Sequence, residues 1–444
     1  MSPIALKLCV AGVWHLGAVA SACFADLGYS VVGFDKDSER VAALNAGHPP
    51  LHEPGLEELL SKNLARGRLR YTNSLVDAAQ GSAYVLFTFD TPVDDNDEVE
   101  LSELFDTATA LAPTIENGAT IIVSSQVPVG TCERLLDTVR EVNSSARGVG
   151  IACVPENLRL GQAIDRFLSP DMIVTGSDDS HTLASAAILY APIDAPKMTV
   201  DLRTAEMTKH AINTYLATCI SFANELANLC DMVGADALKV VEALRKDARV
   251  SPKAPLLPGS GFSGGTLARD VKILRQLGRE HGYPPPFFDG VWEANQRQAE
   301  VPVTRLKDVL PDLNGLTVAV LGLTYKPGTS TLRRSAALEV IKTLISEGAN
   351  VQAYDPQADP QELVQHEGFT VCSSVDDAVR DGDAMLFTTP WPEFKELDFA
   401  RLGGSMKSRV LVDAHNFLDA ESLREIGFTY LGMGRSARPL AAMS

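Results

Sequence analysis

Residues 6–35 read LKLCVAGVWHLGAVASACFADLGYSVVGFD, and this stretch decides the fold class. It starts with a short apolar run, passes through the glycine-containing turn GVWHLG, continues as AVASACFADLG and ends in a second apolar run closed by an acid. Apolar runs without alternation are typical of parallel strands that are covered on both faces. The order strand, glycine turn, helix, strand predicts the first βαβ unit of a doubly wound α/β domain.

The same rhythm continues outward from this stretch. Similar apolar runs occur at 84–90, 119–125, 150–155 and 172–176, and a second series follows at 317–323, 350–356, 384–390 and 409–415. Between the two series, residues 203–246 contain no strand-like run and repeat their apolar residues at helical spacing. We therefore predict an α/β chain of two Rossmann-like doubly wound domains joined by a long central helix. The predicted boundaries are 1–197, 198–300 and 301–444.

Composition excludes several classes of function. The chain has 444 residues, is 45% hydrophobic and 22% charged, and carries a formal net charge of −18. Such an acidic surface repels polyphosphate, so nucleic acid is excluded as a general partner. No apolar run approaches the roughly 18 residues of a membrane span. Residues 8–24 could pass for the apolar part of a signal peptide, but they run directly into the next strand, so we interpret them as the start of the fold.

The cysteines point to a reducing compartment. They are Cys9, Cys23, Cys132, Cys153, Cys219, Cys230 and Cys372. Their number is odd, they are scattered, and no two form a CxxC pair, which disfavours a disulfide scaffold and a structural metal site. We expect a cytoplasmic protein without a bound metal.

The first glycine turn predicts a dinucleotide site. Gly12 and Gly17 occupy the first and third positions of G-x-G-x-x-G, and Asp35 ends the second strand 23 residues after Gly12. An acid there would bind the ribose hydroxyls of NAD and repel the 2′-phosphate of NADP. The middle position is Trp14 instead of glycine. The turn is therefore either an altered NAD site or a purely structural strand-to-helix turn, and the repeating βαβ pattern favours NAD.

Further motifs resemble the UDP-glucose/GDP-mannose dehydrogenase family along almost the whole chain. They are HEPGLEELL (52–60), DTP (90–92), CVPENLRLGQAIDRFLSPDMIVTG (153–176), AEMTKHAINTYLATCISFANE (205–225), LPGSGFSGGTLARDV (257–271), GLTYKPGTSTLRRS (322–335), YDP (354–356) and VDAHN (412–416). The resemblance implies oxidation of the C6 alcohol of a nucleotide sugar, with NAD as cofactor. It also implies a C-terminal domain that binds the nucleotide, UDP being favoured, and a homodimer.

The resemblance also implies roles for individual residues. The implied catalytic residues are Glu156, Lys209, Asn213, Asp270 and position 266, which is Thr266 here. The implied cofactor-binding residues are Gly12, Trp14, His15, Leu16, Asp35, Thr91, Ser125 and Gln126. The implied substrate-binding residues are Leu158, Arg249, Phe262, Gly265, Lys326 and Arg333. In many members of the family, the arginine that corresponds to Arg249 reaches the sugar nucleotide from the neighbouring subunit. Lys209 and Asn213 are four residues apart and so share one helix face.

Thr266 is the main departure from the family pattern. The family has a nucleophilic cysteine there, which attacks the aldehyde before the second oxidation. A thiol has a pKa of about 8.5, whereas the pKa of an aliphatic alcohol is much nearer that of water, about 15.7. Four hypotheses follow: a single two-electron oxidation, a four-electron oxidation without thiol catalysis, a non-catalytic binding protein, and a β-hydroxyacid dehydrogenase. The second nucleotide domain and the GFSGG loop argue against the last.

Overall fold

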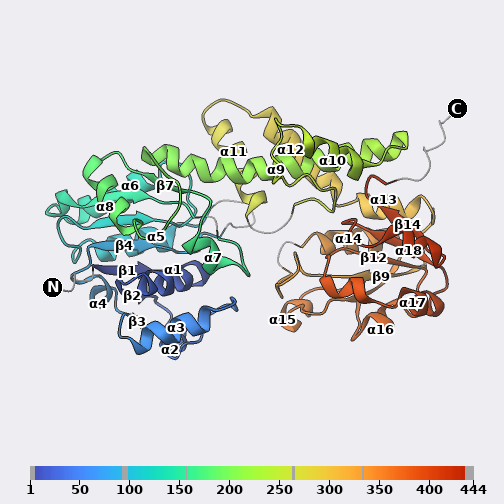
Figure 1. Cartoon of the computed structure of the whole chain (residues 1–444), viewed down its shortest axis with the longest axis horizontal. Coiled ribbons are helices and arrows are strands. Elements are labelled where there is room, and N and C mark those ends of the chain that lie inside the picture. Colours follow the sequence, from blue (N-terminus) through green and yellow to red (C-terminus); the bar gives the residue numbers. More distant parts are fainter. Residues whose placement is uncertain (1–5, 93–98, 157, 263–265, 333–334, 436–444) are drawn as a thin grey trace. The chain divides into compact units, whose positions relative to one another are not determined.

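The computed structural model describes residues 6–92, 99–156, 158–262, 266–332 and 335–435. The chain divides into two compact units, Met1–Ala211 and Ile212–Ser444, and the division falls inside the long helix α9 (Leu202–Val233). Each unit is built around its own twisted sheet (Figure 1). Among the described residues, no helix combines the length and apolar character needed to cross a membrane.

The first unit has an eight-stranded sheet in the order β3-β2-β1-β4-β5-β6-β7-β8. Its strands are β1 (Lys7–Ala11), β2 (Ser30–Phe34), β3 (Leu69–Thr72), β4 (Tyr84–Phe87), β5 (Thr120–Val123), β6 (Gly150–Cys153), β7 (Ile173–Gly176) and β8 (Lys197–Val200). Its helices before α9 are α1 (His15–Asp26), α2 (Ser38–Asn45), α3 (Leu56–Ala65), α4 (Leu75–Ala79), α5 (Ser102–Leu111), α6 (Thr131–Val142), α7 (Ala163–Leu168) and α8 (Ser180–Leu189). All neighbouring strands are parallel except β6 and β7.

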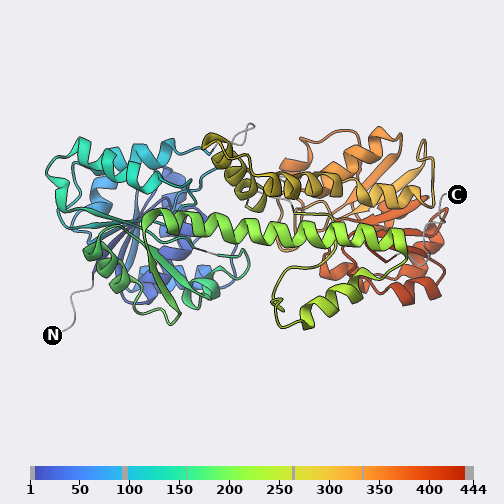
Figure 2. The ribbon, with the colours of Figure 1, turned by 90° about the horizontal axis from the view of Figure 1, so that it is seen from above.

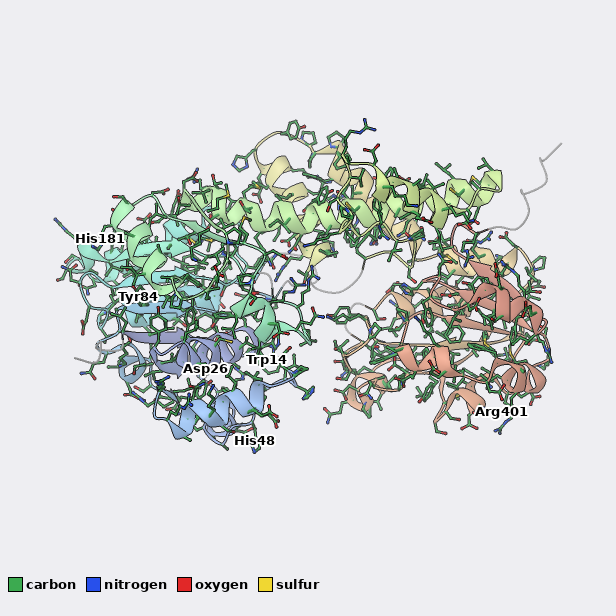
Figure 3. The ribbon with its side chains drawn as sticks, in the orientation of Figure 1. Trp14, Asp26, His48, Tyr84, His181 and Arg401 are labelled. Carbon is green, nitrogen blue, oxygen red and sulfur yellow. The ribbon has the colours of Figure 1, made fainter. Side chains whose placement is uncertain are left out.

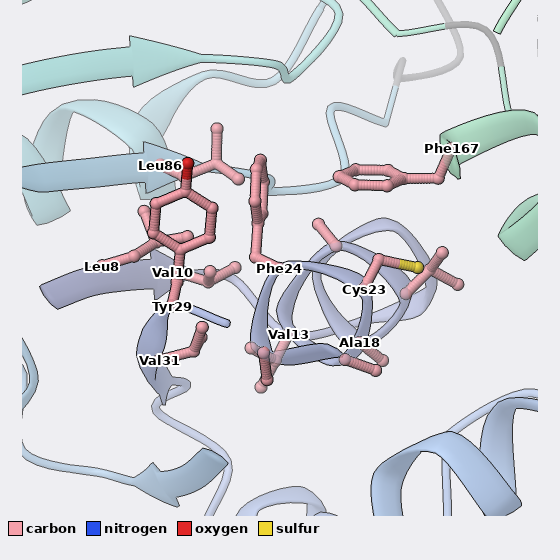
Figure 4. Packing of buried hydrophobic residues seen from close by; sticks show 14 of the residues in the cluster. Leu8, Val10, Val13, Ala18, Cys23, Phe24, Tyr29, Val31, Leu86 and Phe167 are labelled. Carbon is pink, nitrogen blue, oxygen red and sulfur yellow. The ribbon is translucent and has the colours of Figure 1, made fainter. Parts of the chain in front are cut away.

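Burial on both faces explains why the strands of this sheet lack sequence alternation. Leu8 and Val10 of β1 belong to one hydrophobic cluster, whereas Cys9 and Ala11 belong to the cluster on the other face. Phe24 of α1 is fully buried in the first cluster, where it packs edge-on against aromatic neighbours (Figure 4). The strand therefore needs apolar residues at every position, as the sequence pattern predicted.

The second unit contains a six-stranded parallel sheet in the order β11-β10-β9-β12-β13-β14. Its strands are β9 (Thr317–Leu321), β10 (Asn350–Tyr354), β11 (Thr370–Val371), β12 (Ala384–Phe387), β13 (Val410–Asp413) and β14 (Thr429–Gly432). Its helices after α9 are α10 (Ala237–Lys246), α11 (Leu267–Glu280), α12 (Pro286–Gln298), α13 (Val301–Lys307), α14 (Ala336–Ser346), α15 (Pro360–Leu363), α16 (Val375–Val379), α17 (Phe399–Ser405) and α18 (Ala420–Glu425). Residues of β9 alternate between two buried clusters in the same way as those of β1.

The predicted central helix is one continuous helix of 32 residues, α9 (Figure 2). Gly234 follows it with a φ of +73°, a left-handed conformation that suits a helix end, and α10 begins at Ala237. The predicted fold class, two doubly wound α/β domains and a long central helix, is confirmed. The three predicted domain boundaries stay a prediction.

Candidate functional site

The glycine turn after β1 is built for close packing. Gly12 has a φ of +90°, and a Cβ atom at this position would lie 2.6 Å from a ring carbon of Phe89. A Cβ atom at Gly17 would lie 2.1 Å from the carbonyl oxygen of Gly12. The turn lies at the carboxyl end of β1, from which the sheet order runs to β2 on one side and to β4 on the other. Open α/β sheets bind their ligands at this type of switch point, against the N-terminus of the following helix.

Asp35 lies beside the same turn, at the end of β2. It is 5% exposed, and its carboxylate accepts hydrogen bonds from the backbone N–H groups of Val13 (3.1 Å) and Asp37 (3.0 Å). The Arg40 guanidinium donates a third hydrogen bond at 2.8 Å and lies 5.1 Å from the centroid of the Trp14 ring. Trp14 is the N-cap residue of α1 and is 39% exposed (Figure 3). The indole is therefore paired with an arginine at the mouth of the turn and is not buried beneath it.

The remaining predicted cofactor residues lie along the carboxyl ends of the strands or in α1. His15 and Leu16 form the start of α1, and His15 Nε2 lies 3.1 Å from a carboxylate oxygen of Glu53. Thr91 donates a hydrogen bond to the backbone carbonyl of Gln126 (2.6 Å). Ser125 is 3% exposed, and its hydroxyl has no hydrogen-bond partner within the part of the chain that the structure describes.

These features fit a dinucleotide. The left-handed Gly12 lets the chain turn sharply from β1 into α1, whose first backbone N–H groups can bind a pyrophosphate. Asp35 can accept hydrogen bonds from ribose hydroxyls, and the unpartnered Ser125 hydroxyl is a polar group left over for a ligand. Trp14 is the one departure, because a side chain occupies the position at which glycine ordinarily allows the closest backbone approach.

Two of the predicted catalytic residues lie together in the first unit. The Lys209 ammonium on α9 donates a hydrogen bond to the backbone carbonyl of Glu156, just beyond β6. The Glu156 carboxylate accepts the backbone N–H of Leu158. Desolvation raises the pKa of the Glu156 carboxyl above 4.5, although the Lys209 charge and the Leu158 hydrogen bond oppose that rise. The Glu156 carboxyl therefore binds a proton more readily than an ordinary glutamate.

The other predicted catalytic residues lie together in the second unit. The Asn213 side-chain amide on α9 donates a hydrogen bond of 2.5 Å to an Asp270 carboxylate oxygen on α11. Both residues are buried, Asp270 completely. Thr266 is the exposed N-cap residue of α11, and its backbone carbonyl accepts the N–H of Asp270 at 3.2 Å. The first turn of α11 therefore places Thr266 one helical turn before the Asn213–Asp270 pair.

Amide side chains that the sequence analysis did not single out hold the loop before Thr266. Asn224 on α9 accepts the N–H of Gly259 (2.7 Å), and Gln298 on α12 donates to the Gly259 carbonyl (2.7 Å). Asn295 makes hydrogen bonds to both backbone groups of Phe262, at 2.7 and 3.0 Å. The three-residue spacing of the two α12 side chains, which puts them on one helix face, is the only sequence signal for this clamp.

The predicted substrate-binding residues divide into three groups. Leu158 and Phe262 lie in the segments just described, next to predicted catalytic residues. Arg249 is exposed and forms hydrogen bonds of 2.9 and 2.7 Å to the Asp247 carboxylate, and the Lys326 ammonium lies 5.5 Å from the centroid of the Tyr325 ring. Gly265 and Arg333 lie outside the described residues.

Comparisons with known proteins point to one family over almost the whole chain. Models of the UDP-glucose/GDP-mannose dehydrogenase family match residues 6–194 (NAD binding domain), 203–297 (central domain) and 319–420 (UDP binding domain). The chain is 34% identical to UDP-glucose 6-dehydrogenase TuaD of Bacillus subtilis, over 97% of this chain and 94% of that protein. It is 33% identical to UDP-glucose 6-dehydrogenase of Pseudomonas aeruginosa, over 97% of this chain and 98% of that protein.

Solved structures lead to the same assignment. A UDP-glucose dehydrogenase from Pyrobaculum islandicum superimposes with a TM-score of 0.88 at 31% identity and 98% coverage of both chains. A UDP-D-ManNAc dehydrogenase from Pyrococcus horikoshii gives a TM-score of 0.86 at 26% identity, over 98% of this chain and 100% of that chain. These matches show that the chain belongs to the UDP-glucose/GDP-mannose dehydrogenase family, a family of NAD-dependent nucleotide-sugar dehydrogenases.

Proposed function

We propose that the chain oxidises an alcohol group of a UDP-linked sugar and that the reaction stops after one two-electron oxidation. The observation that carries this proposal is Thr266, the exposed N-cap residue of α11, one turn before the Asn213–Asp270 pair. The family pattern has its nucleophilic cysteine at this position. The residues for the first oxidation are present in the chain, whereas the thiol for the second is replaced by an alcohol.

The first oxidation removes a hydride from the alcohol carbon and a proton from the alcohol oxygen, and leaves a carbonyl group. Bound NAD supplies the hydride acceptor. The Lys209 ammonium is suited to stabilise negative charge that develops on the oxygen. Asp270, oriented by Asn213, and Glu156, with its raised pKa, are the carboxyl groups suited to receive the proton directly or through water. This division of roles follows the family resemblance.

The second oxidation requires addition of a nucleophile to the aldehyde before a second hydride can leave. None of the seven cysteines of the chain lies at position 266. Cys219 follows Asn213 by six residues on α9, about 120° away around the helix, and is buried in a separate apolar cluster. Burial raises the pKa of the Cys9 thiol to about 12 and also raises the pKa of Cys372, so neither of them is an activated thiol.

The proposal is tested by counting the NADH formed per substrate consumed, with a panel of UDP-sugars and with identification of the product by mass spectrometry. We expect one NADH and a product that has lost two hydrogens. Two NADH and a uronic acid from the wild-type chain would overturn the proposal in favour of four-electron oxidation without a thiol. Binding of UDP-sugar and NAD without any NADH would identify a binding protein.

Substitutions at position 266 test whether the missing thiol is what prevents the second oxidation. Thr266→Cys is expected to raise the yield from one NADH to two, because a thiolate can form the covalent adduct. Thr266→Ser is the matched control, since it changes the size of the side chain but keeps an alcohol, and it is expected to leave the yield at one. If Thr266→Cys folds, binds UDP-sugar and still gives one NADH, the missing thiol is not the cause.

We also propose that the chain forms a homodimer through α9. Its support is an apolar stripe on this helix, formed by Tyr215, Phe222, Leu229, Met232 and Val233, which are 50–71% exposed. The spacing of seven residues and then of three or four places them along one side of the helix. Exposed apolar stripes of this kind are typical of protein interfaces.

Light scattering of the purified chain tests this proposal. The wild type is expected to have the mass of a dimer, and Phe222→Asp with Leu229→Asp is expected to shift it to the monomer, because two charges would have to be buried. Val364→Asp is the control, because Val364 is an exposed apolar residue of the second unit that lies outside α9. A monomeric wild type would contradict the proposal.

A further inference from the structure

The buried Glu53 carboxylate joins two segments of the first unit that are far apart in the sequence. Glu53 precedes α3 and is 2% exposed. One oxygen accepts hydrogen bonds from His15 Nε2 (3.1 Å) and from the backbone N–H of Gly161 (2.9 Å), and the other accepts the N–H of Ala163 (2.8 Å). The three donors lie 38, 108 and 110 positions away along the chain. No step of the proposed oxidation uses this carboxylate.

The first of these segments is the cofactor turn. His15 is the first residue of α1 and directly follows Trp14. Its imidazole contacts the Glu53 carboxylate and is 17% exposed. A ligand that binds the first N–H groups of α1 therefore acts on a backbone segment whose first side chain is anchored to Glu53.

The second segment, residues 158–163, contains Leu158, one of the predicted substrate-binding residues. It begins at Leu158, whose N–H binds the Glu156 carboxylate, and it ends at Ala163, where α7 starts. Gly161 has a left-handed φ of +85°, and Gln162, the N-cap residue of α7, gives no side-chain cap. Glu53 supplies the missing cap from outside the helix, so the start of α7 depends on this one carboxylate.

A buried carboxylate with three donors makes those donors interdependent. Loss of one donor leaves a charged oxygen poorly satisfied, which is costly in a buried position. A change in the position of His15 is therefore felt at Gly161, which shares the same oxygen. The two segments have no need of direct contact to influence each other.

We propose that Glu53 is a positioning residue that couples occupancy of the cofactor turn to the ordering of residues 158–163. The coupling passes from α1 through His15 to the Glu53 carboxylate, and from there to the N–H groups of Gly161 and Ala163. Cofactor binding would thus prepare the segment that carries Leu158 for the sugar nucleotide. This inference rests on the proposed binding of NAD at the Gly12–Gly17 turn.

Amide hydrogen exchange of the full chain with and without NADH tests the coupling. NADH is expected to slow exchange in a peptide that covers residues 158–168 on the order of tenfold in the wild type. His15→Ala, measured at NADH concentrations that saturate the variant as determined by calorimetry, is expected to abolish this remote effect. His15→Gln, which keeps a side-chain donor for Glu53, is expected to restore much of it. His48→Ala, an exposed histidine after α2, is the control and should behave as the wild type.

Glu53→Gln gives a second, independent test. Its side-chain NH₂ would face an N–H donor in either amide orientation, so residues 158–163 are expected to exchange faster even without NADH. The proposal is overturned if NADH does not slow exchange in this peptide of the wild type, or if it does so equally in His15→Ala. Absence of NADH binding in calorimetry would instead contradict the proposed cofactor, and a different NADH yield would contradict only the extent of oxidation.

Discussion

In the first unit the chain leaves β1 through Gly12 and enters α1 at His15, whereas in the second unit it leaves β9 through Gly322 and enters α14 only at Ala336. The two glycines have nearly the same conformation, with φ values of +90° and +94°. The helix N-terminus therefore lies directly against the turn in sequence only in the first unit. Because a helix N-terminus can supply N–H groups to a pyrophosphate, we expect the two similar turns to differ in their capacity to bind one.

The acids at the ends of β2 and β10, Asp35 and Asp355, differ in their hydrogen-bond partners. Asp35 is bonded by two backbone N–H groups and by Arg40. One oxygen of Asp355 accepts the N–H groups of Leu323 (2.6 Å) and Thr324 (3.0 Å), the Thr324 hydroxyl (3.1 Å) and the Trp391 indole N–H (3.0 Å). Four donors therefore surround one oxygen of Asp355, whereas the three donors of Asp35 are shared between its two oxygens. Both units thus use a strand, a left-handed glycine and an acid to build the turn. We infer that the turn can bind a dinucleotide only where a helix N-terminus follows it directly, as α1 does in the first unit.

Alanine at the two turn glycines should have the largest effect on stability. Unequal losses of stability in the two variants would show that the two turns are not sterically equivalent. A Cβ atom would lie 2.6 Å from Phe89 in the first turn and 2.5 Å from Thr389 in the second. We expect Gly12→Ala and Gly322→Ala each to lower the free energy of unfolding by roughly 2–5 kcal/mol, from strain and overpacking together. Urea denaturation measures this. Gly118→Ala, at a φ of +94° in open space, is the control and should cost about 1 kcal/mol.

Substitution of the two acids should separate cofactor binding from stability. Asp35→Ala is expected to weaken NADH binding by about 10- to 100-fold, the loss of hydrogen bonds to a charged group. Asp355→Ala is expected to lower the unfolding free energy but to leave NADH affinity within about twofold. Titration calorimetry on both variants decides this. Equal losses of NADH affinity would contradict the division of roles between the two domains.

Trp391→Phe tests how much one of the four donors to this Asp355 oxygen contributes to stability. The variant keeps an aromatic ring but removes the indole N–H that binds Asp355. We expect the unfolding free energy to fall by about 1.5–3 kcal/mol, the contribution of one hydrogen bond to a charged carboxylate, with no change in NADH affinity. If Trp391→Phe causes no further loss of unfolding free energy in a chain that already carries Asp355→Ala, the two side chains act as one unit.

A pH titration should give the smallest effect and sharpen the description of the second turn. Thr388 contacts the carbonyl of Gly322, and its own carbonyl accepts a hydrogen bond from His415 (2.9 Å). Burial lowers the pKa of the His415 imidazole below 6.5, although the Thr388 hydrogen bond and Asp413 oppose this. The unfolded chain therefore binds this proton at higher pH than the native chain.

Acidification should therefore destabilise the native chain through His415. The free energy of unfolding should fall as the pH drops below 6.5 toward the lower native pKa, because the unfolded state takes up the proton first. Burial raises the pKa of Asp413, which acts in the opposite sense, so the difference between wild type and His415→Gln reports the imidazole together with its interaction with Asp413. Thermal unfolding between pH 7 and pH 5 measures that difference. Identical pH dependence in both chains would show that His415 contributes nothing.

Some parts of the site could be predicted from the sequence because their signals are local. The turn around Gly12 and the acid Asp35 follow from residue types at short spacings, and the structure places them side by side. The sequence does not explain Trp14, and only the structure shows its ring beside Arg40. The amide clamp formed by Asn224, Asn295 and Gln298 was missed, because isolated amides on helices carry no local signal of the backbone groups they bind.

The sequence by itself determined the fold class, the family and the absence of a cysteine at position 266. These depend on apolar periodicity and on residue identity, which local sequence records completely. Only the tertiary structure decided that Asn213 holds Asp270 across 57 positions, that Glu53 caps a helix 110 positions away and that Asp355 is occupied by Trp391. Such pairs depend on how strands and helices pack after the chain has turned many times, so no short stretch of sequence specifies them.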